Sequence, residues 1–125
     1  MHLSAHIDRP VKDVYEYIAD PANLPAWAPG LGSTIENVDG RWFVDSAALG
    51  RVEVVFAPRN DLGVLDHHVT VASGETFYNP VRVIADGDGS EIIFTVRRAN
   101  STVDFDADVR AVQADLDGLK RILEA

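Results

Sequence analysis

The last fifth of this 125-residue chain, Ser101–Ala125, predicts one long amphipathic helix after an unbroken run of strand-like segments. Ser101 or Thr102 is the expected N-cap of this helix. A long helix with one apolar side needs an apolar surface to lie on, which is either the wall of a filled core or the lining of a pocket. The apolar side chains recur at spacings of four and three, as one helical stripe requires: Phe105, Val109, Val112, Leu116, Leu119 and Leu123.

Length and charge restrict the class of protein. The chain is long enough for one core, so we expect a single domain over residues 1–125. The net charge is −9, and the basic residues are scattered, which makes nucleic acid and anionic membrane surfaces poor partners. No apolar run approaches the roughly 18 residues that a membrane-spanning helix needs. We therefore expect a small-molecule partner and a monomer or homodimer.

Residue types exclude further chemistry. The sequence has no cysteine, which excludes disulfides, thiolate zinc sites and cysteine nucleophiles. The four histidines show no metal-ligand spacing, and no phosphate-binding glycine loop or nucleophile elbow is present. No metal or cofactor is predicted. The N-terminus carries no basic residue or apolar signal core, so a cytoplasmic location is expected.

The first quarter of the chain predicts a short strand and two short helices. Residues 3–7 alternate as a strand does. Pro10 suits the first position of a helix that extends to about residue 19. Asp20 and Pro21 restart the chain as a second short helix through Trp27, which the glycine-rich segment 29–32 ends.

Residues 33–100 predict six strands joined by tight turns. Asp39-Gly40 is a strong two-residue hairpin signal. Further turns are predicted at residues 48–50, 58–63, 73–75 and 86–89. Cross-strand neighbours share a face, so the five turns together predict one apolar face. The predicted pairs are Ile35–Val44, Asn37–Trp42, Val44–Val54, Trp42–Phe56, Phe56–Leu65, Val54–His67, Val52–Val69, Val71–Phe77, Val69–Asn79, His67–Val81, Ile92–Val83, Phe94–Val81 and Val96–Asn79.

The two faces of the predicted sheet differ in polarity. Four polar residues interrupt the apolar face: Asn37, Ser46, His67 and Asn79. Polar groups in a dry core are costly, whereas they orient ligands among the apolar walls of a cavity, so we favour a cavity. On the opposite face, the pairs Asp66–Arg82 and Glu53–His68 are interpreted as weak surface ion pairs.

Three segments carry a resemblance to a known family. They are IDRPVKDVYEYIAD (residues 7–20), PANLPAW (residues 21–27) and LDGLKRILE (residues 116–124). In this order and spacing they resemble the START-like, or SRPBCC, superfamily, and in particular its small bacterial members of the polyketide cyclase/dehydrase type. The resemblance covers the whole chain. The glycine-rich loop of the plant members is reduced here to Asp39-Gly40, so properties tied to that loop are not carried over.

The resemblance implies an α+β helix-grip fold. In this fold a curved antiparallel sheet of about seven strands wraps around the long C-terminal helix, two short helices follow the first strand, and an apolar cavity lies between sheet and helix. It implies no single activity, because members bind lipids, sterols or polyketides, and some cyclise or dehydrate aromatic polyketides. Function has to be argued from the site.

Two hypotheses follow for the predicted cavity, and His67 separates them. The first is binding of a small hydrophobic ligand, whether lipid, aromatic or polyketide-like. The alternative is a cyclase or dehydratase that uses His67 as acid or base, although a buried histidine satisfied by Asn79 or a backbone carbonyl explains the same residue. A third reading is a partner-binding or structural protein whose cavity is filled.

The expected ligand-binding set follows from the predicted face and the final helix. Trp27 and Trp42 are expected at the entrance of the pocket, and Arg97 or Arg98 near it. The full predicted set is Trp27, Asn37, Trp42, Ser46, Val54, Phe56, His67, Val69, Phe77, Asn79, Val81, Phe94, Val112 and Leu116.

Overall fold

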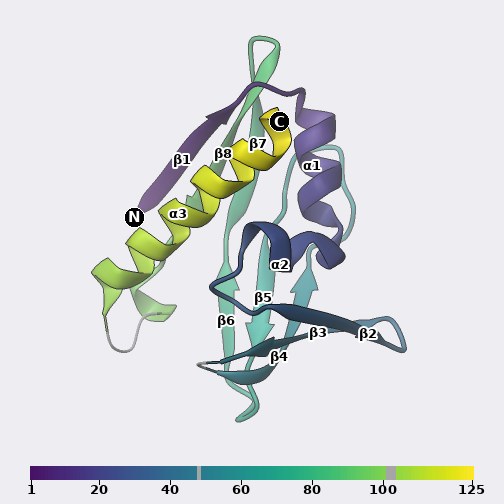
Figure 1. Ribbon diagram of the computed structural model, residues 1–125, viewed down its shortest axis with the longest axis vertical. Coiled ribbons are helices and arrows are strands. Elements are labelled where there is room, and N and C mark those ends of the chain that lie inside the picture. Colours follow the sequence, from purple (N-terminus) through teal and green to yellow (C-terminus); the bar gives the residue numbers. More distant parts are fainter. Residues whose placement is uncertain (48, 101–103) are drawn as a thin grey trace.

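The long C-terminal helix lies against a curved antiparallel sheet (Figure 1). The computed structural model describes residues 1–47, 49–100 and 104–125. The helix, α3, spans Phe105–Glu124, and the Asp104 side chain caps it by accepting a hydrogen bond from the Ala107 amide at 3.0 Å. The caps predicted at Ser101 or Thr102 lie outside the described residues.

The remaining elements confirm the predicted order of a strand, two short helices and a series of strands. None of the helices in the described part of the chain is long and apolar enough to cross a bilayer. The elements are β1 (His2–Ile7), α1 (Val11–Ala19), the 3-10 helix η1 (Pro21–Asn23), α2 (Leu24–Trp27), β2 (Thr34–Val38), β3 (Arg41–Ser46), β4 (Gly50–Phe56), β5 (His67–Thr70), β6 (Thr76–Asn79), β7 (Val81–Asp86), β8 (Gly89–Thr95), the 3-10 helix η2 (Arg98–Asn100) and α3.

Pro80 divides the sheet into two ladders, β1-β8-β7 and β2-β3-β4-β5-β6. Proline has no N–H to donate, so β6 and β7, predicted as one strand, are two. The described strands therefore number eight rather than about seven. Backbone hydrogen bonds from Leu65 N to Val81 O (2.8 Å) and from Val83 N to Gly63 O (3.0 Å) link the ladders. Gly63 has a φ of +71°, and a Cβ there would lie 2.1 Å from the Val83 carbonyl oxygen.

The predicted register is confirmed at both ends of the sheet and wrong in the middle. Asp39 and Gly40 both take positive φ, as the two-residue hairpin between β2 and β3 requires. The three central hairpins each close one residue away from the predicted turn, which shifts their pairing by two. The confirmed pairs are Ile35–Val44, Asn37–Trp42, Val83–Ile92 and Val81–Phe94, and the pairs found in place of predicted ones are Val44–Val52, Trp42–Val54, Phe56–His67, Val54–Val69, Val69–Phe77 and His67–Asn79.

The reason for the shift is visible at the first of these turns. The Ser46 hydroxyl accepts a hydrogen bond from the Leu49 amide at 3.2 Å and fixes the turn between Ser46 and Gly50. A shift of two residues keeps each side chain on its face, so the predicted apolar face survives. The predicted Asn79–Val96 pair is not among the strand pairs either, because the β7–β8 ladder starts at Val81–Phe94 and Asn79 belongs to β6, where it pairs with His67.

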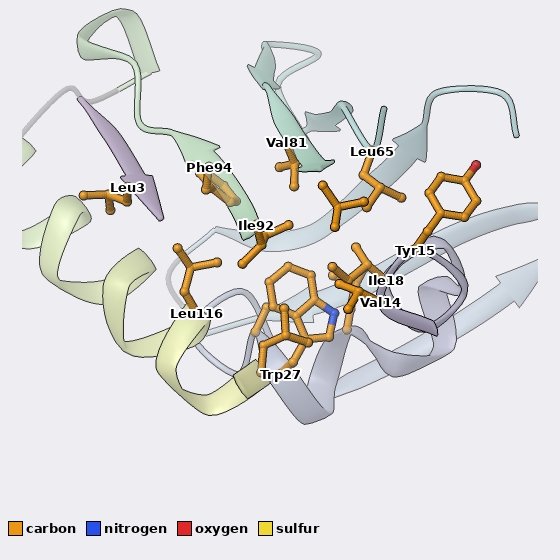
Figure 2. Packing of buried hydrophobic residues seen from close by; sticks show 14 of the residues in the cluster. Leu3, Val14, Tyr15, Ile18, Trp27, Leu65, Val81, Ile92, Phe94 and Leu116 are labelled. Carbon is orange, nitrogen blue, oxygen red and sulfur yellow. The ribbon is translucent and has the colours of Figure 1, made fainter. Parts of the chain in front are cut away.

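The core lies between the sheet and all three α-helices, with Trp27 at its centre (Figure 2). The Trp27 indole lies between Leu116 of α3 and Ile18 of α1. Trp27 is buried, and its Nε1 has no hydrogen-bond partner within the described residues. Figure 2 shows this nitrogen on the side of α1, away from Phe94. Its side chain therefore joins the second helix to both the sheet and the final helix.

Asp66 pairs with Arg82 as predicted and is the centre of a polar cluster. The expected surface position is confirmed for the exposed Arg82 and wrong for the buried Asp66 carboxylate. This carboxylate accepts hydrogen bonds from Arg82 Nε and Nη2 at 2.9 and 2.7 Å, from the Val81 amide at 2.8 Å and from the Tyr78 hydroxyl. The Arg82 hydrogen bonds are the main reason why the pKa of Asp66 falls from 3.8 to about 2. Because Tyr78 and Val81 flank Pro80, this cluster fixes the strand break.

The other predicted surface pair is also different in the structure. Glu53 lies opposite Thr70 and forms its ion pair with Arg41, with Nε and Oε2 2.8 Å apart. The ring of His68 lies instead against Tyr78, with centroids 5.0 Å apart. The two-residue shift of the β4–β5 hairpin explains the change of partner.

Replacement of the Asp66 carboxylate is expected to destabilise the fold. We predict that Asp66→Asn lowers the free energy of unfolding by about 1–3 kcal/mol near neutral pH, because the charge-assisted bonds to Arg82 are lost. Asp88→Asn, in an exposed turn, is the matched control. Urea denaturation checks the prediction, and equal stability of the two variants would contradict it.

The same carboxylate sets a pH window for stability. The folded-state pKa is lowered, so the stabilisation is present above the ordinary pKa of 3.8 and is lost as the pH falls toward about 2. The stability of Asp66→Asn should therefore fall less steeply than that of the wild type over this window. Denaturation curves along a pH series measure the difference.

Candidate functional site

A pocket of about 250 Å³ lies between α2, the first half of α3 and the inner face of the sheet. We call it the helix–sheet pocket. Most of its walls are apolar, and its polar residues come from the sheet, from η2 and from α3. It is lined by Leu24, Trp27, Ala28, Gly30, Leu31, His67, Val69, Asn79, Phe94, Val96, Arg97, Asn100, Asp108, Ala111, Val112 and Asp115.

The apolar walls come from elements far apart in the sequence. α2 supplies Trp27, β8 supplies Phe94, and α3 supplies Val112. Two local hydrogen bonds position α2. The Asp20 carboxylate accepts from the Ala22 amide at 3.0 Å, and the Asn23 side chain donates to the Tyr17 carbonyl at 2.9 Å. These bonds fix the sharp turn that brings Trp27 over the sheet.

A row of hydrogen bonds runs along the polar side of the pocket. His67 Nδ1 lies 3.2 Å from the Leu65 carbonyl oxygen, which can only accept, so Nδ1 carries the proton. Nε2 therefore accepts from the Asn79 amide nitrogen at 3.3 Å. The Asn79 side-chain oxygen in turn accepts from Asn100 Nδ2 at 3.2 Å, and that nitrogen also donates to the Tyr78 carbonyl at 2.8 Å.

Burial keeps the His67 imidazole neutral. Its pKa falls from 6.5 to about 4, chiefly because the charged form would lose its hydration. The rings of Phe56 and Phe94 lie beside it, with centroids 4.9 and 6.1 Å away. The histidine thus has both ring nitrogens engaged by the protein and holds no charge near neutral pH.

Charged residues lie on the α3 and η2 sides of the pocket. Asp115 is half-buried, and burial raises its pKa from 3.8 to about 6. Asp108, two helical turns earlier on α3, is exposed. The Arg97 guanidinium lies over the Tyr78 ring, 5.6 Å from its centroid. Arg98 is not among the lining residues and stacks on Phe105 at 4.3 Å.

The structure brings together part of the predicted ligand-binding set. Six members line the helix–sheet pocket: Trp27, His67, Val69, Asn79, Phe94 and Val112. His67 and Asn79, predicted as diagonal neighbours, are directly paired.

The structure places the other members of the predicted set elsewhere. Val81 and Leu116 are buried in the core, and Phe77 is half-buried. Asn37 is exposed and accepts a hydrogen bond from the Gly40 amide at 3.0 Å. Ser46, as described above, stabilises a turn. Trp42, Val54 and Phe56 line a separate groove of about 470 Å³ beside η1, so Trp27 and Trp42 do not share one entrance.

Sequence reasoning missed Asp115 and Asn100. Asp115 follows Val112 by three residues, so the two lie on neighbouring positions of one helix face. That spacing was available in the sequence, but an aspartate at the edge of an apolar stripe is typical of a solvated helix. Asn100 precedes residues 101–103, and no sequence pattern brings its amide to Asn79.

A third concave site, besides the helix–sheet pocket and the groove that contains Trp42, has a more polar lining. A groove of about 480 Å³ between α1 and the loop before β5 is lined by eight residues, four of them charged. Its Arg59 pairs with Glu16, both exposed. Among the described residues, no group of three or more histidines and carboxylates could hold a metal ion. We therefore base the functional argument on the helix–sheet pocket.

Comparison with known proteins identifies the family. The model of the family described as polyketide cyclase / dehydrase and lipid transport matches residues 1–124. The chain belongs to this family. This family is of the SRPBCC type, as the sequence resemblance indicated. No curated protein matches the chain in sequence.

Solved structures show the same fold at low sequence identity. The solution structure of the Aha1 dimer from Colwellia psychrerythraea has a TM-score of 0.74 and 15% identity, covering 99% of this chain and 95% of that one. The crystal structure of Ara h 8.0201 has a TM-score of 0.64 and 15% identity, with 98% and 95% coverage. DynU16, a protein in the dynemicin biosynthetic locus, has a TM-score of 0.66 and 17% identity, covering 100% of this chain and 47% of that one.

The hydrogen-bond row makes a prediction for the His67 imidazole. We expect ¹⁵N NMR to show the Nδ1–H tautomer and no protonation of His67 until the pH falls toward about 4. Asn79→Ala should shift the Nε2 resonance and leave Nδ1–H in place, because the Leu65 carbonyl still accepts from it. Protonation of His67 near its ordinary pKa of 6.5, or an Nε2–H tautomer, would contradict the arrangement.

Proposed function

We propose that this protein binds a small, largely apolar ligand in the helix–sheet pocket. The observation that carries the proposal is the pocket of about 250 Å³, whose apolar walls include Trp27, Phe94 and Val112. Burial of apolar ligand surface against these side chains would provide the affinity. Membership of a family described by polyketide and lipid chemistry supports the same ligand class.

The volume limits the size of the ligand. An apolar cavity of about 150 Å³ accommodates benzene, whereas drug-sized ligands occupy about 300–1,000 Å³. The helix–sheet pocket lies between these values. We infer a ligand with one or two rings, or a short acyl chain. A polyketide with several fused rings would extend beyond the open side of the pocket.

The state of His67 favours binding over catalysis. A general base needs a free lone pair and a pKa near the working pH. Here Nε2 accepts from Asn79, and burial lowers the pKa to about 4. The alternative, a cyclase or dehydratase that uses His67, would first have to break the bond to Asn79. The similarity to DynU16, a protein from a biosynthetic locus, is the observation that supports this second function.

Filling the pocket is expected to weaken ligand binding. Val112→Trp places an indole into the cavity, and Ala111→Phe does so from the neighbouring exposed position. Each should weaken the affinity for naphthalene, measured by isothermal titration calorimetry, by at least about tenfold, because the ligand and the new side chain compete for one volume. Ile122→Trp, at an exposed position on α3, is the matched control and should retain wild-type affinity.

Two results would contradict the proposal. Wild-type affinity in both folded pocket variants would place the ligand elsewhere. Turnover of an aromatic polyketide that His67→Ala abolishes, with ligand affinity unchanged, would establish the enzyme in place of the binding protein. Native mass spectrometry of the purified protein provides the first view of co-purifying ligands.

A further inference from the structure

The helix–sheet pocket contains a half-buried carboxylate, that of Asp115, which has no partner among the described residues, and this bears on the chemistry of the ligand. We propose that the ligand carries an ammonium group that pairs with Asp115, while its apolar part contacts Trp27 and Phe94. This inference rests on the proposed function, since it names the chemical class of ligand for the same pocket.

The other polar groups of the inner wall already have partners. His67 uses both ring nitrogens, one toward Leu65 and one toward Asn79. The Asn79 oxygen accepts from Asn100, whose nitrogen also donates to Tyr78. A ligand gains little from these atoms unless it breaks the row. The polar group that is free to select a ligand therefore lies on the helix side of the pocket.

Asp115 is the half-buried pocket residue whose carboxylate lacks a partner within the described residues. Within the described residues its carboxylate takes part in no hydrogen bond or ion pair, although it is half-buried beside apolar walls. Burial without a partner disfavours its charged form and raises the pKa to about 6. A cation placed against it would restore the stabilisation that hydration no longer supplies.

The opposite choice, an anionic ligand held by Arg97, fits the pocket less well. The Arg97 guanidinium lies over the Tyr78 ring, and the negative potential of the ring face partly compensates its positive charge. An anion would also meet Asp115 and Asp108 on α3. The net charge of −9 attracts cations and repels anions over the whole surface.

The position of Asp115 defines the shape of the ligand. It follows Val112 by three residues, so its carboxylate and the apolar wall lie on neighbouring positions of α3. A single ring with an amine on a short chain reaches both at once. 2-Phenylethylamine has this form. Three probes of similar size differ in the polar group: 2-phenylethanol carries a neutral hydroxyl, 3-phenylpropionate carries a carboxylate, and propylbenzene has no polar group.

The test compares the four probes on three proteins by calorimetry at about pH 7.5, where Asp115 is ionised. The proteins are the wild type, Asp115→Asn and, as the control, Asp117→Asn. Asp117 is exposed on the same helix and does not line the pocket. We expect the wild type to bind 2-phenylethylamine about tenfold tighter than 3-phenylpropionate, and Asp115→Asn to lose most of this preference. Propylbenzene affinity should be equal in all three proteins.

The outcomes separate the two proposals. If propylbenzene and the other probes fail to bind the wild type, the proposed function is wrong, and this inference with it. If propylbenzene binds but the carboxylate probe is preferred, or Asp115→Asn and Asp117→Asn bind the amine equally, only the ammonium inference is wrong. Thermal unfolding of both variants confirms that each is folded.

Discussion

The Asp66 carboxylate is the interaction on which the rest of the structure depends. It accepts hydrogen bonds from residues on both sides of Pro80, where the sheet divides into two ladders. The next residue, His67, points to the opposite face and pairs with Asn79, which directly precedes the proline. Asp66 thus stabilises the strand break on the outer face of the sheet. On the inner face, His67 and Asn79 beside the same break line the pocket. The position of the hydrogen-bonded His67, Asn79 and Asn100 side chains in the pocket therefore depends on the Asp66 hydrogen bonds.

The final helix has two different halves. Toward its C-terminus, Leu116, Leu119 and Leu123 are buried, and Arg9 and Lys120 bind backbone carbonyls that join this end of α3 to β1 and the segment after it. Toward its N-terminus, the stripe residues are only half-buried. The helix is therefore anchored to a solid core at one end and covers the pocket at the other. This division explains how one amphipathic stripe both stabilises the fold and leaves space for a ligand.

The sequence was sufficient for the fold and placed six of the sixteen lining residues in the predicted ligand-binding set. Spacing of apolar residues predicted the helix, and turn residues such as Asp39-Gly40 fixed the outer hairpins. The central turns were each misplaced by one residue, because local side-chain bonds such as that of Ser46 decide where a turn closes. Placement of Trp42 away from the pocket depends on how far the sheet curves, and the isolation of Asp115 depends on what packs around it. Neither is encoded in the spacing of residues along the chain.

The most direct test of the account is where an apolar probe binds. Intermolecular NOEs between naphthalene and the isotope-labelled protein identify the side chains in contact with it. We expect NOEs to Trp27, Phe94 and Val112, which line the helix–sheet pocket. NOEs to the groove that contains Trp42 and Phe56 instead, or no NOEs at saturating naphthalene, would contradict it.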